Sequence, residues 1–419
     1  MKKIIIFGAG NIGRSFIGQL FSRSGYEAVF IDIDDKIINA LNGRRRYRIE
    51  IKDAHPETIW VENVRAVHGK DAEKVANEIV TADIMATAVG PNNLPYIYGN
   101  IAKGLLKRLE LNSGPIDIII CENIRDASKI FKEGLSKHLP ESYPLDSTVG
   151  LVETSIGKMV PMMTEKQRKE DPLLLFAEAY NILIADKMGF KGEIPKVEGL
   201  EAKGNMAAYV DRKLFVHNMG HAVTAYLAYI TDPKMKYIWE AISDDCIQKA
   251  VKGAMWESGR ALIAEYHEDF NEENMREHID DLICRFRNKA LWDTIYRVGR
   301  DVPRKLSRND RLIGSLILDA KHGVPAPCTT IGAAAAMVFR GKDEKGEMYE
   351  KDRIFSEETY PCGIDFILKE VCGLDFKSDR KLIDNIKEAY ESIIRDWENW
   401  FSWLNCKGFI DDQLARHID

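Results

Sequence analysis

The sequence predicts a doubly wound α/β domain followed by a mostly α-helical domain. Short β-branched runs alternate with helix-like stretches in the N-terminal half, and long helical patterns replace the strand signals after about residue 195. The length of 419 residues points the same way, since a domain usually holds ~100–200 residues. We therefore expect two domains, residues 1–195 and residues 196–419.

The first strand is expected at residues 3–7, where Lys-Ile-Ile-Ile-Phe shows no polar alternation. Such a run is typical of a strand that is buried on both faces of a parallel sheet. Similar runs span residues 28–33, 83–89, 116–121 and 148–156, and helix-like stretches lie between them at residues 11–24, 92–109 and 125–138. This alternation predicts parallel strands joined by crossover helices.

Helical patterns fill the second half of the chain. The expected helices span residues 213–229, 238–266, 273–290, 307–320 and 381–404. Glycine and proline cluster between Gly189 and Gly199, so the domain boundary is expected there.

Composition and charge are those of an ordinary globular protein, with 45% apolar and 30% charged residues. A formal net charge of −6 argues against nucleic acid as a partner, because such a partner requires a basic face. No run approaches the ~20 apolar residues that cross a bilayer. The seven scattered cysteines contain no Cys-x-x-Cys pair and indicate reduced thiols. We expect a cytoplasmic protein without a nucleic-acid or membrane partner.

The motif Gly8-Ala-Gly10-Asn11-Ile12-Gly13 follows the first strand directly and opens a helix. In that context it is the fingerprint of a Rossmann-type dinucleotide-binding domain. Gly8 permits the tight turn, Gly10 lets the backbone approach a pyrophosphate, and Gly13 allows close packing of helix on strand. The helix N-terminus offers free N–H groups and a positive dipole end to the phosphates.

Asp32 follows Gly13 by 19 residues and ends the second strand. A carboxylate at this place accepts hydrogen bonds from both ribose hydroxyls, which predicts NAD as the cofactor. The 2′-phosphate of NADP would need a cation, and the nearby basic cluster Arg44-Arg45-Arg46 is of a kind that more often forms a solvated loop. The expected cofactor-binding residues are Gly8, Gly10, Asn11, Ile12, Gly13, Asp32, Ala88 and Val89.

Lys213, Asn218 and His221 place a base, an amide and an imidazole within three helical turns. At ~100° per residue, Asn218 lies ~140° and His221 ~80° round from Lys213, so all three can reach one cleft. A lysine can move the hydroxyl proton of an alcohol if burial lowers its pKa from ~10.4 to ~7–8. Spacing alone, however, favours a surface lysine and an ordinary helix histidine over a catalytic pair.

The run Lys213-x-x-x-x-Asn218-x-x-His221 resembles the signature of the polyol-specific long-chain dehydrogenases, the mannitol dehydrogenase family. Further matching blocks cover most of the chain to about residue 340, and they lie at residues 7–18, 87–91, 121–123, 251–259 and 297–313. The resemblance implies a metal-independent, NAD-linked interconversion of a sugar-alcohol phosphate and a ketose phosphate, with mannitol 1-phosphate and fructose 6-phosphate expected first. Free mannitol or a uronate is the alternative substrate within the family.

The resemblance also implies roles for the site residues. Lys213 would be the general acid and base, Asn218 and Asn123 would polarise the carbonyl oxygen, and His221 would hold a substrate hydroxyl. Asn123 suits this role because it follows the strand at residues 116–121, at a carboxyl end where ligands collect.

A sugar phosphate needs cations, and residues 300–308 are rich in them. Because arginine forks match phosphate oxygens, substrate contacts are expected from Arg300, Arg304 and Lys305. The alternative is a charged face whose arginines pair with Asp301 and Asp310. The chain departs from the family pattern at Gly157-Lys158, where an acidic residue and an arginine are usual, and this bears on the choice of sugar.

Three other interpretations remain open at this point. Tyr209-x-x-x-Lys213 matches the tyrosine–lysine pair of short-chain dehydrogenases, although the glycine loop and the chain length do not fit that class. His217 and His221 stand at i, i+4, but without a third ligand or a His-Glu-x-x-His motif we expect no metal. The third interpretation is a non-catalytic sensor that binds NAD and a sugar phosphate. A monomer or homodimer is expected.

Overall fold

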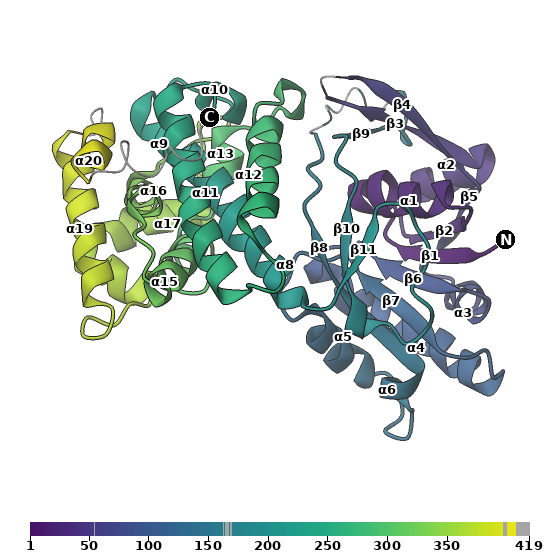
Figure 1. Ribbon diagram of the computed structural model, residues 1–419. Helices are drawn as coiled ribbons and strands as arrows, with labels where there is room; N and C mark the ends of the chain where they lie inside the picture. The colour runs from purple at the N-terminus through teal and green to yellow at the C-terminus, as the bar shows by residue number, and fades with distance from the viewer. Residues whose placement is uncertain (54, 162, 164–166, 168–169, 397–399, 408–419) are drawn as a thin grey trace. The chain divides into compact units, whose positions relative to one another are not determined.

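The computed structural model describes residues 1–419 except 54, 162, 164–166, 168–169, 397–399 and 408–419 (Figure 1). The chain divides into two compact units, Met1–Val210 and Asp211–Asp419. The first is an α/β unit built on a mostly parallel sheet and the second is helical, so the predicted fold class is confirmed.

The first unit contains an eight-stranded sheet with the order β11-β10-β8-β7-β6-β1-β2-β5. In this order, the neighbouring strands from β8 through β7, β6, β1 and β2 to β5 pair in parallel. Strand β10 runs antiparallel to β8. The strands are β1 (Lys3–Phe7), β2 (Glu27–Asp32), β5 (Val64–His68), β6 (Ile84–Thr87), β7 (Ile116–Ile120), β8 (Val149–Ile156), β10 (Leu183–Asp186) and β11 (Leu200–Lys203).

Alternate residues of β1 enter two separate apolar cores, one on each face of the sheet. Ile4 and Ile6 pack with Phe16 of the helix that follows the glycine motif. Ile5 and Phe7 pack with Ile101 of α4 (Leu94–Glu110) on the opposite face. Because both faces are covered, the strand is apolar at every buried position, as its sequence predicted.

The other main helices of this unit connect the parallel strands. They are η1 (Gly13–Gly18, a π-helix), α1 (Gln19–Arg23), α2 (Asp35–Arg44), α3 (Ala72–Val80), α5 (Ala127–Ser136) and α6 (Leu145–Thr148). A second, three-stranded sheet has the order β4-β3-β9, with β3 at Arg46–Ile51, β4 at Glu57–Glu62 and β9 at Leu175–Ala177. None of these three strands was among those expected from the sequence.

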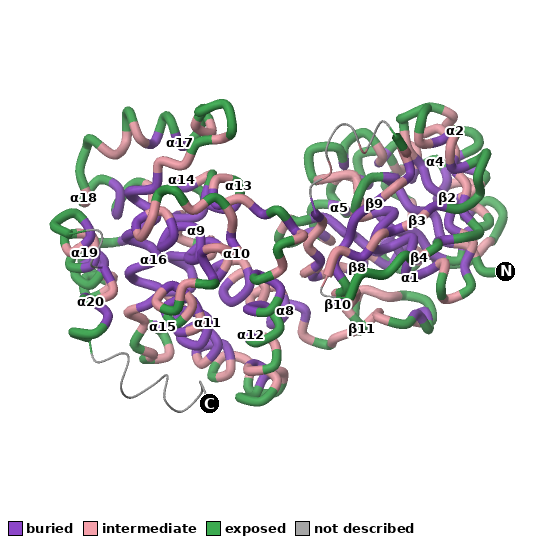
Figure 2. Tube along the Cα trace, turned by 90° about the horizontal axis from the view of Figure 1, so that it is seen from above, coloured by how far each residue is buried: buried purple, intermediate pink, exposed green. Residues whose placement is uncertain are grey.

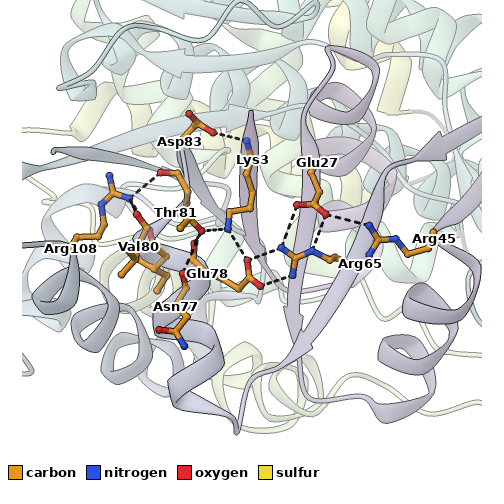
Figure 3. Close-up of polar contacts among 12 residues, drawn as sticks. Lys3, Glu27, Arg45, Arg65, Asn77, Glu78, Val80, Thr81, Asp83 and Arg108 are labelled. Carbon is orange, nitrogen blue, oxygen red and sulfur yellow. Dashed lines mark hydrogen bonds and ion pairs between the residues drawn. The ribbon is translucent and has the colours of Figure 1, made fainter. Parts of the chain in front are cut away.

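An ion-pair network ties three strands of the large sheet to α3 (Figure 3). Arg65 of β5 lies between two carboxylates, with Nε 2.9 Å from Glu27 of β2 and Nη1 2.5 Å from Glu78 of α3. Glu78 also accepts from Lys3 of β1 at 2.8 Å. Burial alone would raise the pKa of Glu78, but Arg65 and Lys3 outweigh it and lower the pKa to about 2.

The second unit packs its helices around α9 (Met219–Thr231) and α16 (Pro327–Val338), which are buried almost all round (Figure 2). Small residues let these helices approach closely: a Cβ on Gly332 of α16 would lie 2.6 Å from Val223 of α9. The remaining main elements are α8 (Met206–Arg212), η4 (Lys213–Asn218), α10 (Ile238–Ala241), α11 (Asp245–Glu265), α12 (Glu272–Phe286), α13 (Ile295–Gly299), α14 (Val302–Lys305), α15 (Ile313–Lys321), α17 (Glu350–Ile354), α19 (Arg380–Arg395) and α20 (Trp400–Cys406).

Two expected helices are shorter than predicted. The stretch 238–266 forms α10 and α11, which are separate because Asp244 is extended and caps the start of α11 with its side chain. The stretch 381–404 ends its first helix at Arg395, where Asp396 is extended. Among the described residues, no helix is both long and apolar enough to cross a membrane.

Candidate active site

The glycine motif forms a tight turn between β1 and the following helix. Gly8 has a φ of +100°, and a Cβ there would lie 2.5 Å from the carbonyl oxygen of Ala88. A Cβ on Gly13 would lie 1.9 Å from the carbonyl oxygen of Gly8. Gly10 differs, because a Cβ there would meet no atom within 4 Å. The turn thus needs glycine at positions 8 and 13, and the space over Gly10 is open to a cofactor.

Asp32 lies at the end of β2, beside this turn. Its carboxylate accepts backbone N–H groups from Ala9 at 2.6 Å, Ile33 at 2.7 Å and Asp34 at 3.0 Å. These bonds hold the carboxylate against the glycine motif. A carboxylate has about four lone-pair sites, so acceptor capacity remains for a ribose hydroxyl. Asp32 and the open space at Gly10 therefore fit a dinucleotide.

Each arginine of the cluster at residues 44–46 forms an ion pair with a carboxylate of its own unit. The pairs are Arg44 with Asp171 at 2.6 Å, Arg45 with Glu27 at 3.3 Å and Arg46 with Glu62 at 4.0 Å. This pairing supports the interpretation of the cluster as a charged surface segment, in keeping with NAD over NADP.

The loop after β6 carries Ala88 and Val89, and a carboxylate from β7's carboxyl end holds it. Glu122 accepts the N–H of Val89 at 3.0 Å and of Gly90 at 2.8 Å. Glu122 is buried, and burial raises its pKa. Asn123 follows it and is exposed. Since β7, β6, β1 and β2 are neighbours in the sheet, these groups share one edge with the glycine motif.

Glu122 was not among the expected site residues. It lies between two residues, Cys121 and Asn123, that the family resemblance had already marked. A carboxylate that directly follows a buried parallel strand was the signal available in the sequence.

Lys213 and Asn218 are the first and last residues of the π-helix η4, which continues into α9. In a π-helix the N–H of each residue bonds to the carbonyl five residues earlier, so residues five apart lie on the same side of successive turns. The expected separation of ~140°, which assumed an α-helix, is therefore wrong. The extra residue per turn brings the amide of Asn218 to the side of Lys213, and such turns are frequent at functional sites.

The surroundings of Lys213 suit an acid and base that works near neutral pH. Lys213 is partly buried. Burial lowers its pKa to about 8, and the positive charge of Arg311 acts in the same direction. Arg311 is held by Asp310, with Nε 2.8 Å from the carboxylate. Arg311 was not among the expected site residues, although it lies in the last block of the resemblance.

His221 lies one turn beyond Asn218 and is held on two sides. Its Nε2 is 3.0 Å from Oδ2 of Asp293, and its ring stacks on Phe286 with centroids 4.7 Å apart. Burial and the charge of Arg285 lower the pKa of His217 well below its usual value, so its ring is neutral. No group of three or more histidines, cysteines or carboxylates is placed as a metal site in the described part of the chain.

Two of the three cations expected to contact a substrate phosphate from the basic segment 300–308 are engaged within their own unit. Lys305 is buried, its Nζ donates to the backbone carbonyls of Val298 and Arg300, and burial with the charges of Arg311 and Arg304 lowers its pKa to about 7. Arg304 pairs with Asp301 at 2.6 Å and with Asp310 at 3.1 Å, which is the surface pairing named as the alternative.

Arg300 and Arg304 are both exposed, and the guanidinium of Arg300 lies 5.6 Å from the ring centre of Tyr349. Phosphate contact by Arg304 and Lys305 stays a prediction that the observed contacts do not favour. In the N-terminal unit, Lys158 donates to the carbonyl of Tyr180 at 2.9 Å and to Asn181 at 3.0 Å. The residue that replaces the family's arginine is thus anchored within its own unit.

Residues 2–199 match the family model described as the mannitol dehydrogenase Rossmann domain, and residues 205–394 match the mannitol dehydrogenase C-terminal domain. The chain is 40% identical over 336 residues to a mannitol-1-phosphate 5-dehydrogenase of Brevibacillus brevis, covering 80% of this chain and 85% of that protein.

Two solved structures share the fold. A substrate-free D-sorbitol dehydrogenase has a TM-score of 0.76 at 17% identity, covering 95% of this chain and 94% of that one. The mannitol 2-dehydrogenase of Pseudomonas fluorescens, solved with NAD and D-mannitol, has a TM-score of 0.72 at 14% identity, covering 97% and 94%. At these identities the likeness concerns the fold.

Proposed function

Because the chain belongs to the mannitol dehydrogenase family, we propose that it interconverts mannitol 1-phosphate and fructose 6-phosphate with NAD as the cofactor. The family makes the chain a dehydrogenase with a Rossmann-type domain for NAD. The substrate comes from the Brevibacillus relative, which is 40% identical and bears the name of that activity. The observation that carries the chemistry is Lys213, whose pKa is lowered to about 8.

When bound, NAD accepts a hydride from the carbinol carbon. In this direction neutral Lys213 takes the hydroxyl proton, and in the reverse direction its ammonium form returns that proton to the alkoxide oxygen. Asn218 donates an amide hydrogen bond to the same oxygen as negative charge develops on it, and Asn123 is proposed for the same task. His221 binds a neighbouring hydroxyl of the substrate.

NAD would be held within the N-terminal unit. The N–H groups at the start of the helix after Gly10 would contact the pyrophosphate, and Asp32 would accept the ribose hydroxyls. Ala88 and Val89 would lie along the cofactor, and Glu122 holds the N–H of Val89. For the substrate phosphate, Arg300 is the favoured contact because it is exposed and, unlike Arg304, forms no ion pair with a described carboxylate.

The test is a spectrophotometric screen of NADH and NADPH against fructose 6-phosphate, fructose, tagaturonate and fructuronate. We expect reduction of fructose 6-phosphate with NADH. A strong preference for an unphosphorylated ketose would overturn the phosphate assignment. If tight NADH binding came with no oxidation of NADH by any of these compounds, the sensor interpretation would replace ours. A cytoplasmic location and a monomer or homodimer stay predictions.

A further inference from the structure

Asp293 is a buried carboxylate beside the imidazole of His221. It is 5% exposed and lies just after η5 (Lys289–Leu291), outside any helix. Arg297, in the first turn of α13, holds Oδ1 with Nε at 2.7 Å and Nη2 at 2.5 Å. Burial alone would raise the pKa of Asp293, but His221 and Arg297 outweigh it, so the pKa is lowered. The carboxylate is therefore charged at neutral pH.

The other carboxylate oxygen needs a donor. Oδ2 of Asp293 is buried and has no hydrogen bond to a described residue. The Nε2 atom of His221 lies 3.0 Å from it, at the distance of an ion pair but without the alignment of a full hydrogen bond. A buried acceptor without a donor costs free energy. A small rotation of the ring that points the Nε2–H at Oδ2 removes this cost.

The stack on Phe286 leaves the ring little freedom to do anything else. The two rings are 4.7 Å apart and nearly parallel, at 16°. Phe286 itself is buried at the end of α12. With one face against Phe286 and Nε2 against Asp293, the Nδ1 atom is left for the substrate.

We propose that Asp293 is a positioning residue that keeps the proton of neutral His221 on Nε2, so that Nδ1 accepts a hydrogen bond from a substrate hydroxyl. This inference rests on the proposed function and deepens it. It makes His221 a hydrogen-bond acceptor at Nδ1. The imidazole then binds a substrate hydroxyl that donates to it, and it does not donate to the reacting carbonyl oxygen. It also separates the tasks of His221 and Asn218, because Asn218 supplies the donated hydrogen bond.

Other charged groups lie near Asp293 and near His217, the histidine one turn before His221. Arg297 stands behind Asp293, and Arg285 and Lys213 act on the neighbouring His217. The tautomer must therefore be read directly from the ring, and a pH profile alone does not identify it.

The experiment combines kinetics with histidine NMR. In Asp293→Asn we expect kcat/KM for fructose 6-phosphate to fall about 10–100-fold, by analogy with the loss of a group that orients a metal-ligating histidine. The Kd of NADH should stay unchanged. Asp319→Asn is the matched control, since Asp319 is a buried carboxyl of the same unit without a hydrogen bond to a described residue. It should retain the kcat/KM of the original protein.

A double-mutant cycle tests whether Asp293 acts through His221. In a His221→Gln background, Asp293→Asn should cost less than threefold, because the imidazole that it positions is gone. An equal loss in both backgrounds would show a merely structural carboxylate and overturn the proposal.

The unmodified protein gives a second test that does not depend on folding of a variant. With 15N-labelled histidine, and with His221→Gln to assign the signal, the His221 ring should show the proton on Nε2 at neutral pH. A ring protonated on Nδ1 alone would overturn the proposal. This measurement needs no turnover, so it remains decisive even if fructose 6-phosphate is not the substrate.

Discussion

Arg311 lies close enough to Lys213 for its guanidinium charge to add to the effect of burial, and together they lower the pKa of Lys213 to about 8. The pKa of Lys213 therefore depends on a second cation of the same helical unit. Asp310 holds Arg311 through a 2.8 Å hydrogen bond, which fixes the source of the positive field. This relationship sets the pH range in which the proposed proton transfer can run in both directions.

The pH dependence of activity follows from this value. Oxidation of the polyol requires neutral Lys213, so its kcat/KM should rise with pH and level off above about 8. Reduction of the ketose requires the ammonium form, so its kcat/KM should fall as pH rises through about 8. If kcat/KM rose with pH for both the oxidation and the reduction, Lys213 would not be the acid and base.

Replacing Arg311 with Gln should move both profiles to higher pH. The variant removes the positive charge that disfavours the ammonium form, and it leaves Asp310 without its Nε partner. Arg353→Gln is the control, because Arg353 pairs only with Glu357 in the described structure and is half exposed. An unshifted profile in Arg311→Gln would mean that burial alone sets the pKa of Lys213.

Removing the proposed acid and base should abolish most of the turnover. Lys213→Ala is expected to lower kcat by ~10²–10⁴, and Asn218→Ala by ~10²–10³. NADH binding, measured by fluorescence titration, should persist in both. Tyr209→Phe should keep most of its turnover. A large loss in that variant would transfer the acid role to Tyr209, as in the short-chain dehydrogenases.

Asp32 should decide affinity for the cofactor. In Asp32→Ser we expect the KM for NAD to rise roughly 10–100-fold, because the hydrogen bonds of a charged acceptor contribute ~1.5–3 kcal/mol. The preference for NAD over NADP should shrink at the same time, since the carboxylate that repels a 2′-phosphate is gone. Initial rates with each cofactor measure both effects, and an unchanged preference would place the discrimination elsewhere.

Glu78 should make the stability of the protein pH-dependent at acid pH. Its pKa is about 2 in the folded chain and ~4.3 in an unfolded one. The stabilisation is therefore present above the unfolded pKa and is lost as pH falls through the folded one. Glu78→Gln should lower the free energy of unfolding at pH 7 by about 1–2 kcal/mol after allowance for partial exposure.

Urea unfolding followed by circular dichroism at pH 7 and pH 3 measures this effect, and the difference between Glu78→Gln and the original protein should be smaller at pH 3. Glu357→Gln is the control, since its ion pair with Arg353 is exposed on both sides. A difference that stays constant with pH would assign the loss to packing.

Local patterns were enough to predict the turn and the strand end that are proposed to bind the dinucleotide. Gly8 and Gly13 are required by the turn that they make with each other and with Ala88, and these contacts lie close to the motif itself. Asp32 is positioned by the N–H groups of its immediate neighbours and of Ala9 in the adjacent turn. A site whose contacts come from one turn and the next strand can be read from spacing.

Other parts of the molecule could not be predicted in this way. The strand β9 has three residues and exists through its pairing with β3, more than a hundred positions earlier. Likewise, the alternation of polar and apolar residues in β3 is visible in its sequence, but its partner is not. Asp293 and Phe286 reach His221 from more than 60 positions away, which no local pattern indicates.

By itself, the sequence determined the α/β and helical halves, the cofactor loop with Asp32, and the lysine, asparagine and histidine of the proposed reaction. These features depend on residue type and on short spacing along the chain. Only the tertiary structure decided that Lys213 and Asn218 share a π-helical turn, that Arg311 tunes Lys213, and that Lys305 and Arg304 are engaged within their own unit. Burial and charge act through space, so the pKa of Lys213 and the orientation of His221 depend on residues that folding brings to them.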